Sequence, residues 1–168
     1  AGTRSYMRDY SILMIHNPFI RDENSRNPDN EQIVNDIQVP VSAGSYFIKN
    51  YLFLSLVFPN STDQRTAWSM SFDPSATPTQ ENGERIYSIF LRAEVTEVGS
   101  GSAKDDAVAK AFDMGSFMNL IGSQEAAKDK DGVYFRIYYV KSVDKDKSKI
   151  TWASSPIIGV PIKKASSL

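Results

Sequence analysis

The strongest apolar signal in the chain is the run NYLFLSLVF at 50–58. It is much shorter than the about 20 apolar residues that a membrane-spanning helix needs. A buried helix is also disfavoured, because Pro59 keeps the residue before it out of helical geometry. Alternate side chains of a strand fall on opposite faces, and one face here would be wholly apolar, with Leu52, Leu54, Leu56 and Phe58. The other face is nearly as apolar, so we predict a central strand that is covered on at least part of both faces.

The same two-residue alternation recurs in three further runs. These runs are TAWSMSF at 66–72, ERIYSIFLRAEV at 84–95 and GVYFRIYYV at 132–140. Such alternation is typical of strands in antiparallel sheets that bury one face. Shorter strand candidates lie at 10–15, 38–41, 107–112 and 149–153.

The segments between these runs carry turn residues. Residues 73–84 predict a long loop that closes on Asn82-Gly83, a pair that favours tight hairpin turns. The polar, glycine-rich stretch GSGSAKDD at 99–106 predicts a flexible connection. Only 113–130 has apolar residues at helical spacing, and it predicts one short helix before the strand at 132–140.

Together these elements predict an all-β fold, an antiparallel β-sandwich with one short helix. The sandwich could be immunoglobulin-like or jelly-roll-like, with roughly seven or eight strands. It would occupy residues 35–162, and residues 163–168 would form a disordered tail. Residues 1–34 read as an N-terminal strand and linker. That strand could be the end of an upstream module or an edge strand of the main sheet.

Composition narrows the function classes. The chain has 168 residues, 19 basic and 20 acidic, and a net charge of -1. Proteins that hold nucleic acid by its backbone usually carry a basic surplus, so we expect no nucleic-acid partner. The absence of cysteine excludes disulfides and thiolate chemistry. We also expect no transmembrane segment. The first residues contain no apolar signal core, so either the protein is cytoplasmic, or a secretory leader was removed or is not part of this sequence.

Residues suited to catalysis are sparse. The only histidine, His16, has no nucleophile motif to serve as a general base. Neighbouring acids occur at Asp22-Glu23, Asp105-Asp106, Asp129/Asp131 and Asp144/Asp146. All lie in predicted loops, where acidic residues commonly form solvated turns. A hydrolase acting through two carboxylates in one cleft is therefore a minor alternative, and we expect a non-enzymatic protein without metal or cofactor.

The best binding candidate is a face rich in aromatic and basic side chains. Two predicted strands would contribute Tyr134, Arg136, Tyr138, Phe90 and Arg92. Aromatic rings can stack on sugar or peptide, and arginine can bind a carboxylate through two hydrogen bonds. If the two strands are neighbours, these residues form one patch. Tyrosine is also a good strand residue, so a purely structural role for this face remains an alternative.

The order of the strands resembles the C-terminal β-sandwich of NigD-like proteins, which are cell-envelope lipoproteins of Bacteroidota. The segments that carry the resemblance are YLFLSLVF, WSMSFDP, RIYSIFLRAEV, AFDMGSFMNLIG, VYFRIYYV and ITW. The shared features are a long apolar strand after an ND…V lead-in, a hairpin partner for that strand, and a later strand, here IFLRAE. The resemblance spans about 35–160, a single-domain length. The family's OB-like barrel would not fit ahead of residue 35, the chain has no lipobox cysteine, and no catalytic residues follow from the resemblance.

These observations lead to one functional hypothesis and one alternative. The first is a non-enzymatic, extracytoplasmic binding or scaffold module that lies in a bacterial cell envelope or is associated with the outer membrane. Its ligand would be a protein, a peptide or a glycan. The alternative is a structural or assembly subunit of a surface fibre, pilus or capsid. That alternative requires an exposed strand edge and oligomers.

Overall fold

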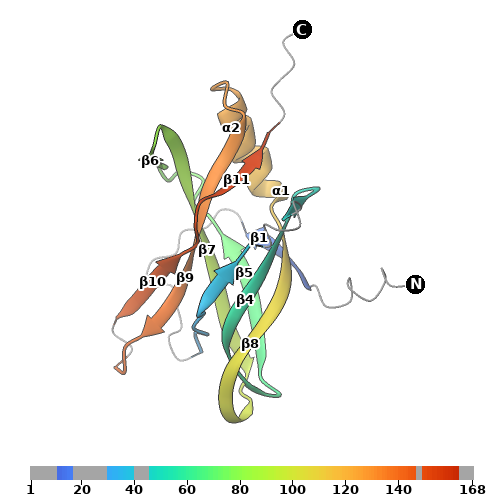
Figure 1. The fold of residues 1–168 in the computed structure, drawn as a ribbon, viewed down its shortest axis with the longest axis vertical. Helices are drawn as coiled ribbons and strands as arrows, with labels where there is room; N and C mark the ends of the chain where they lie inside the picture. Colours follow the sequence, from blue (N-terminus) through green and yellow to red (C-terminus); the bar gives the residue numbers. More distant parts are fainter. Residues whose placement is uncertain (1–10, 17–29, 40–45, 147–148, 163–168) are drawn as a thin grey trace, which may run out of the picture.

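A computed structural model describes residues 11–16, 30–39, 46–146 and 149–162. It confirms the all-β sandwich: two sheets pack face to face, and one short helical segment lies at one end (Figure 1). Sheet A contains β1 (Ser11–His16), β8 (Ser100–Asp113), β4 (Tyr51–Thr62), β2 (Asp36–Gln38) and β3 (Phe47–Ile48). Sheet B contains β5 (Arg65–Ser71), β7 (Glu84–Glu97), β9 (Gly132–Val143), β10 (Ile150–Ser154), β11 (Ile158–Pro161) and β6 (Thr79–Glu81).

The core lies between the two sheets and follows the predicted alternation. Along β4, every second side chain is buried, and these are Leu52, Leu54, Leu56 and Phe58. They belong to one cluster with inward residues of sheet B, among them Trp68, Met70, Ile89, Phe135 and Ile137. Burying each large apolar side chain stabilises the fold by about 1.5–3 kcal/mol. The side chains of β4 that point outward are half-buried, as expected for a central strand.

The pairing is mixed, whereas the sequence predicted an antiparallel sandwich. β7 and β9 run parallel, with Phe90 opposite Tyr138. The reason is the path between them: β8 returns the chain to the end where β7 begins, and the helical segment there leads into β9 (Figure 1). β1 also pairs in parallel, with β8 through residues 11–14 and with β5 through 15–16. It therefore joins the two sheets along one side of the sandwich.

Two predicted connections are wrong. The strand after β4 is not its hairpin partner, because β4 pairs with β8, β2 and β3, whereas β5 pairs with β7 and β1. The short link between β4 and β5 therefore crosses from one sheet to the other. Residues 99–106 are also not a loop but mostly the first half of β8, which is exposed and paired with β4. Neither face of this half is buried, so it carries no apolar signal.

The predicted turn at Asn82-Gly83 and the predicted short helix are both present. β6 and β7 form a hairpin that turns at Asn82 and Gly83, whose φ angles are 51° and 82°. Two positive φ values in a two-residue turn are the type I′ geometry that Asn-Gly favours. The helical segment consists of α1 (Gly115–Phe117), a π-helical turn (Met118–Gly122) and α2 (Ser123–Ala126). Phe117 anchors it, with ring contacts to Phe72 and Phe135.

Residues 30–38 connect the sheets at a second place, which the sequence did not reveal. Gln32 N donates to Ala93 O of β7 at 2.9 Å, and Val34 N donates to Val140 O of β9 at 2.9 Å. The chain thus enters the fork where β7 and β9 separate, and β2 then pairs with β4. In the ranges described, no helix is long and apolar enough to span a membrane.

Candidate functional site

The parallel register of β7 and β9 brings the predicted binding residues onto neighbouring strands. Ser88 lies opposite Arg136 and Phe90 opposite Tyr138, on the face of sheet B that points away from the core. Phe90, Tyr134, Arg136 and Tyr138 are partly exposed there. The two strands are therefore neighbours and place these four side chains on one face, although the contacts of the individual side chains differ.

Three aromatic rings gather on this face. The ring centroids of Phe90 and Tyr138 are 5.7 Å apart with an interplanar angle of 30°. Trp152 of β10 meets Phe90 edge-on at 5.7 Å. We call these three residues the aromatic cluster. Trp152 was not predictable as a member of this face, because its run at 149–153 is too short to show which face the indole takes.

Arg136 lies next to the aromatic cluster and is held in place by two partners. Its Nη2 contacts Glu81 Oε2 at 2.7 Å, and its Nη1 donates to Ser155 O at 3.3 Å. The hydrogen bond that Arg136 donates to the Glu81 carboxylate raises the pKa of Arg136 above its ordinary value. Glu81 belongs to β6, which pairs with β7, and Ser155 lies between β10 and β11, which pair with β9, so two separate segments hold the guanidinium beside the rings while part of it stays exposed.

Arg92 does not belong to the exposed surface. It is only 7% exposed, and its Nη2 forms an ion pair with Glu31 Oε2 at 2.8 Å. Glu31 lies in the stretch that enters the fork between β7 and β9, and its backbone bridges to Glu94. This pair therefore ties residues 30–38 to β7, and its charge is already matched within the fold.

Tyr134 has a clear structural role. Gly159 of β11 lies opposite it in the register. A Cβ atom placed on Gly159 would be 2.8 Å from the tyrosine ring, and one placed on Gly132 would be 3.4 Å from it. The ring thus covers two glycines that have no side chains of their own, a known way of stabilising glycine in a sheet.

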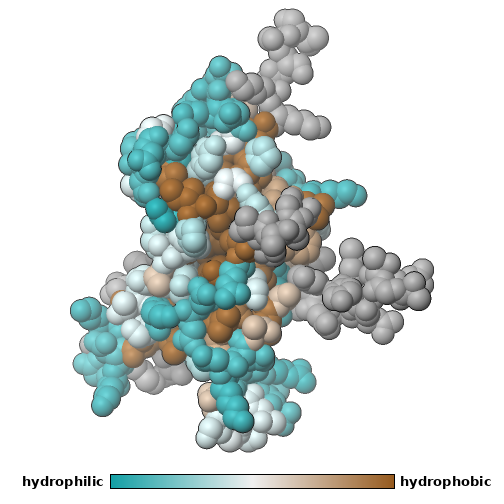
Figure 2. All heavy atoms as spheres, in the orientation of Figure 1, coloured by the Kyte–Doolittle hydropathy of each residue, from teal (hydrophilic) through white to brown (hydrophobic). Residues whose placement is uncertain are grey.

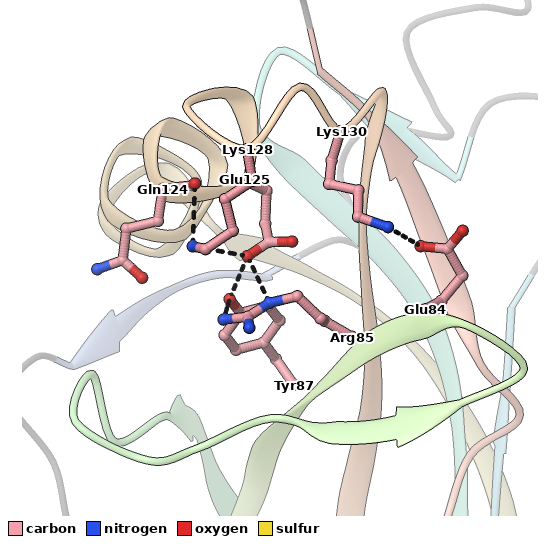
Figure 3. Close-up of polar contacts among 7 residues, drawn as sticks. All are labelled: Glu84, Arg85, Tyr87, Gln124, Glu125, Lys128 and Lys130. Atoms are coloured by element: carbon pink, nitrogen blue, oxygen red, sulfur yellow. Dashed lines mark hydrogen bonds and ion pairs between the residues drawn. The ribbon is translucent and has the colours of Figure 1, made fainter.

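A second polar cluster, which the sequence did not predict, joins the helical segment to β7 (Figure 3). Glu125 of α2 is only 2% exposed. It accepts hydrogen bonds from Tyr87 Oη at 2.6 Å and from Arg85 Nε at 3.0 Å, and Lys128 Nζ lies 3.5 Å away. Lys130 forms a separate ion pair with Glu84 (Figure 3).

The environment of Glu125 favours its charged form. Burial alone raises the pKa of Glu125, but the hydrogen bond from Tyr87 and the charges of Arg85 and Lys128 outweigh it, so the pKa lies below its ordinary value. Burial and the same carboxylate raise the pKa of Tyr87. A carboxylate with this many donors is a poor proton acceptor. We interpret the cluster as a structural link between helix and sheet.

The predicted acid pairs lie at the surface. Asp105 accepts a hydrogen bond from Asn35 Nδ2 at 2.7 Å, and Asp106 accepts one from Asn60 Nδ2 at 3.1 Å. Asp129, Asp131, Asp144 and Asp146 are exposed. Asp22 and Glu23 fall outside the described residues, and for His16 only the backbone in β1 is described. Within the described ranges, no three histidine, aspartate or glutamate side chains are grouped so that they could hold a metal ion.

Comparison with known proteins identifies similar folds. An uncharacterized protein from Parabacteroides merdae ATCC 43184 superimposes with a TM-score of 0.75 at 23% identity, over 92% of this chain and 67% of that one. A "putative lipoprotein" from Bacteroides fragilis NCTC 9343 gives a TM-score of 0.51 at 10% identity, over 94% of this chain and 71% of that one. No protein-family model and no curated protein matches the sequence. The fold therefore occurs in solved Bacteroidota proteins.

Proposed function

We propose that the chain is a non-enzymatic binding or scaffold module of a bacterial cell envelope, and that it contacts its ligand through the aromatic cluster and Arg136. Two solved Bacteroidota proteins share the fold, and one is described as a "putative lipoprotein". The resemblance of the strand order to NigD-like proteins points the same way. This assignment places the protein outside the cytoplasm, at or near the outer membrane.

The observation that carries the proposal is the composition of the outer face of sheet B. Phe90, Tyr138 and Trp152 are neighbours that keep part of their surface exposed. Aromatic rings of this kind supply much of the contact area in many binding sites for glycans and peptides. Arg136 adds a fixed, partly exposed cation that can bind a carboxylate or a carbonyl oxygen.

A direct test measures binding of the labelled protein to cell envelopes isolated from Bacteroides fragilis. Replacing both Tyr138 and Trp152 with alanine should weaken saturable binding at least about tenfold, because alanine truncation of a central aromatic contact typically costs about 2 kcal/mol or more. The matched control replaces Tyr51 and Phe53, two half-buried aromatics on the outward face of β4, with alanine. Equal binding by the wild type and the Tyr138/Trp152 variant, with both folded, would remove the aromatic cluster from consideration.

One observation favours the alternative, an assembly subunit. β4 pairs with β8 along its length, but β1 covers the opposite edge of β8 only at 110–113. Among the described strands, none pairs with that edge at 100–109. This stretch carries three charged residues, Lys104, Asp105 and Asp106, and a bulge opposite Asn60–Thr62. Charged residues and bulges at a strand edge usually prevent edge-to-edge pairing.

Analytical ultracentrifugation over a wide concentration range separates the two functions. Our proposal predicts a monomer at all concentrations, because the part of β8 at 100–109 that no described strand covers is charged and interrupted by a bulge. Oligomers that grow with concentration, and that disappear when a proline is placed at Ala107, would favour the assembly subunit.

A further inference from the structure

The ion pair between Arg136 and Glu81 lies beside the aromatic cluster. The side chain of Arg136 is 25% exposed and that of Glu81 is 35% exposed, with 2.7 Å between Nη2 and Oε2. Tyr138 follows Arg136 by two residues on the same face of β9, so their Cα atoms are about 7 Å apart. A molecule that lies on the rings of Phe90 and Tyr138 can therefore also reach the ion pair.

An exposed ion pair does not by itself mark a binding site. Figure 2 shows hydrophilic surface towards both ends of the molecule and hydrophobic surface gathered around its middle. Arg65 and Glu97 form an ion pair whose side chains are 73% and 60% exposed, so water solvates most of it. The pair of Arg136 and Glu81 differs because it is largely shielded from water and has aromatic rings beside it. Electrostatic contacts with such a shielded pair contribute more to binding than contacts with a solvated one.

Both arginines that β7 and β9 turn away from the core are paired with a glutamate. Glu81 balances the charge of Arg136, and Glu31 balances that of Arg92. An acidic ligand at Arg136 would also meet the negative charge of Glu81, and a basic ligand at Glu81 would meet the positive charge of Arg136. Like charges that are brought together at an interface are costly. The pair therefore favours a ligand without net charge.

The same ion pair presents a hydrogen-bond donor and an acceptor side by side. A guanidinium only donates hydrogen bonds, and a carboxylate only accepts them. A hydroxyl does both, so two neighbouring hydroxyls of one sugar ring can accept from Arg136 and donate to Glu81. The apolar C–H face of the same ring can lie on the ring of Tyr138. A neutral sugar thus matches all three side chains at once.

The place of the site in the sheet disfavours a peptide. β9, which carries Arg136 and Tyr138, lies inside sheet B, with β7 on one side and β10 and β11 on the other. A peptide on this face has no strand edge to pair with, and its own N–H and C=O groups would be covered without partners, which is costly. A glycan carries hydroxyls in place of such a backbone.

From these features we infer that the outer face of sheet B binds a neutral glycan. Its sugar rings would lie on the aromatic cluster, and its hydroxyls would contact Arg136 and Glu81. This inference rests on the proposed function, because it names the ligand class of the same surface. It excludes acidic glycans and peptides as the ligand.

Competition for envelope binding tests the inference. Glycans are released from isolated Bacteroides fragilis envelopes and separated by ion exchange into a neutral and an acidic fraction. We expect the neutral fraction to displace the labelled protein from envelopes, and the acidic fraction to leave it bound. The affinity for the neutral fraction should change less than twofold between low and high salt, because salt screens charges and the ligand carries none.

Two variants with the same change in net charge sharpen the test. Glu81→Gln should bind the neutral fraction about fivefold more weakly, because hydrogen bonds to a charged group are stronger than those to an amide. It should also gain binding to the acidic fraction, because the charge of Arg136 is then unmatched. Glu97→Gln, at the exposed pair with Arg65, is the control and should bind like the wild type. Both variants should melt at the wild-type temperature, because partly exposed ion pairs contribute little to stability.

Several results would overturn the inference and leave the proposed function standing, provided that envelope binding still requires Tyr138 and Trp152. These results are displacement by the acidic fraction alone, displacement by neither fraction, and a Glu81→Gln variant with wild-type affinity and selectivity. Binding that proteinase K digestion of the envelopes abolishes and that the neutral fraction does not compete would assign the face to a protein ligand, which also overturns the inference. If the Tyr138/Trp152 variant binds envelopes like the wild type, the proposed function fails and the inference fails with it.

Discussion

At the scale of single residues, Ser155 shows how a side chain can replace a backbone partner. It lies in the bend between β10 and β11 and is buried. Its Oγ accepts a hydrogen bond from Ile137 N at 2.9 Å and donates one to Pro156 O at 2.8 Å. The hydroxyl therefore satisfies an N–H of β9 where the neighbouring strand bends away.

Replacing Ser155 with alanine should lower the free energy of unfolding by about 1–3 kcal/mol, because the N–H of Ile137 would be buried without a partner. Chemical denaturation measures this change. Ser154→Ala, one residue earlier and exposed, is the control and should change the free energy by less than about 0.5 kcal/mol. Equal effects of the two substitutions would show that the Ser155 hydroxyl contributes little.

Glu125 leads to a prediction about pH. Its pKa in the folded protein lies below the ordinary value of 4.5. The charged carboxylate therefore stabilises the fold fully above the unfolded pKa, and this contribution is lost as the pH falls through the lower folded pKa. Glu125→Gln should destabilise the protein at pH 7, and its difference from wild type should shrink as the pH approaches 3. Urea denaturation at several pH values measures the difference, and a difference independent of pH would contradict the charged state.

Residue-scale contacts were the least predictable part of the molecule. In the alternating run at 84–95, Tyr87 shares a face with Ile89 and Leu91, and all three are buried in the structure. Its partner Glu125 is 38 residues away, and nothing in the local pattern of either segment reveals the pairing. The same holds for Arg92. Ser88 and Glu94 on the same face of the strand suggested that Arg92 is exposed, whereas its ion pair with Glu31 makes its burial tolerable.

At the scale of elements, the sequence predicted strands wherever one face is buried. β4, β5, β7 and β9 have strongly alternating patterns and were found close to their true positions. The first half of β8 was missed because both its faces are exposed and only its pairing with β4 makes it a strand. Pairing partners were not predictable for a similar reason, because alternation states which side chains are buried but not against which strand.

The Arg92–Glu31 ion pair fixes one such unpredicted element, residues 30–38. Its side chains are 8% and 3% exposed, so removing one partner leaves a charge buried. Arg92→Met should therefore lower the free energy of unfolding by about 3–5 kcal/mol. The double variant Arg92→Met/Glu31→Leu should be more stable than Arg92→Met alone, because no unpaired charge remains. A double variant that loses the sum of the two single effects would contradict this account of the pair.

At the scale of the whole molecule, the fold class followed from sequence, whereas the arrangement of the sheets did not. The short link from β4 to β5 could make a hairpin or cross between sheets, and its length allows both. The direction of β9 relative to β7 depends on the path of β8 and the helical segment together. The candidate site was predictable in part: the register of β7 and β9 unites Phe90 with Tyr138, but Trp152 joins them only because β10 lies beside β9.

Side-chain footprinting with hydroxyl radicals, on the protein alone and bound to isolated Bacteroides fragilis envelopes, tests the central claim most directly. If the outer face of sheet B is the contact surface, Phe90, Tyr138 and Trp152 become protected on binding, whereas Tyr51 and Phe53 on the outward face of sheet A keep their reactivity. Unchanged reactivity of Tyr138 and Trp152 in the bound protein, or protection confined to Tyr51 and Phe53, would contradict the account.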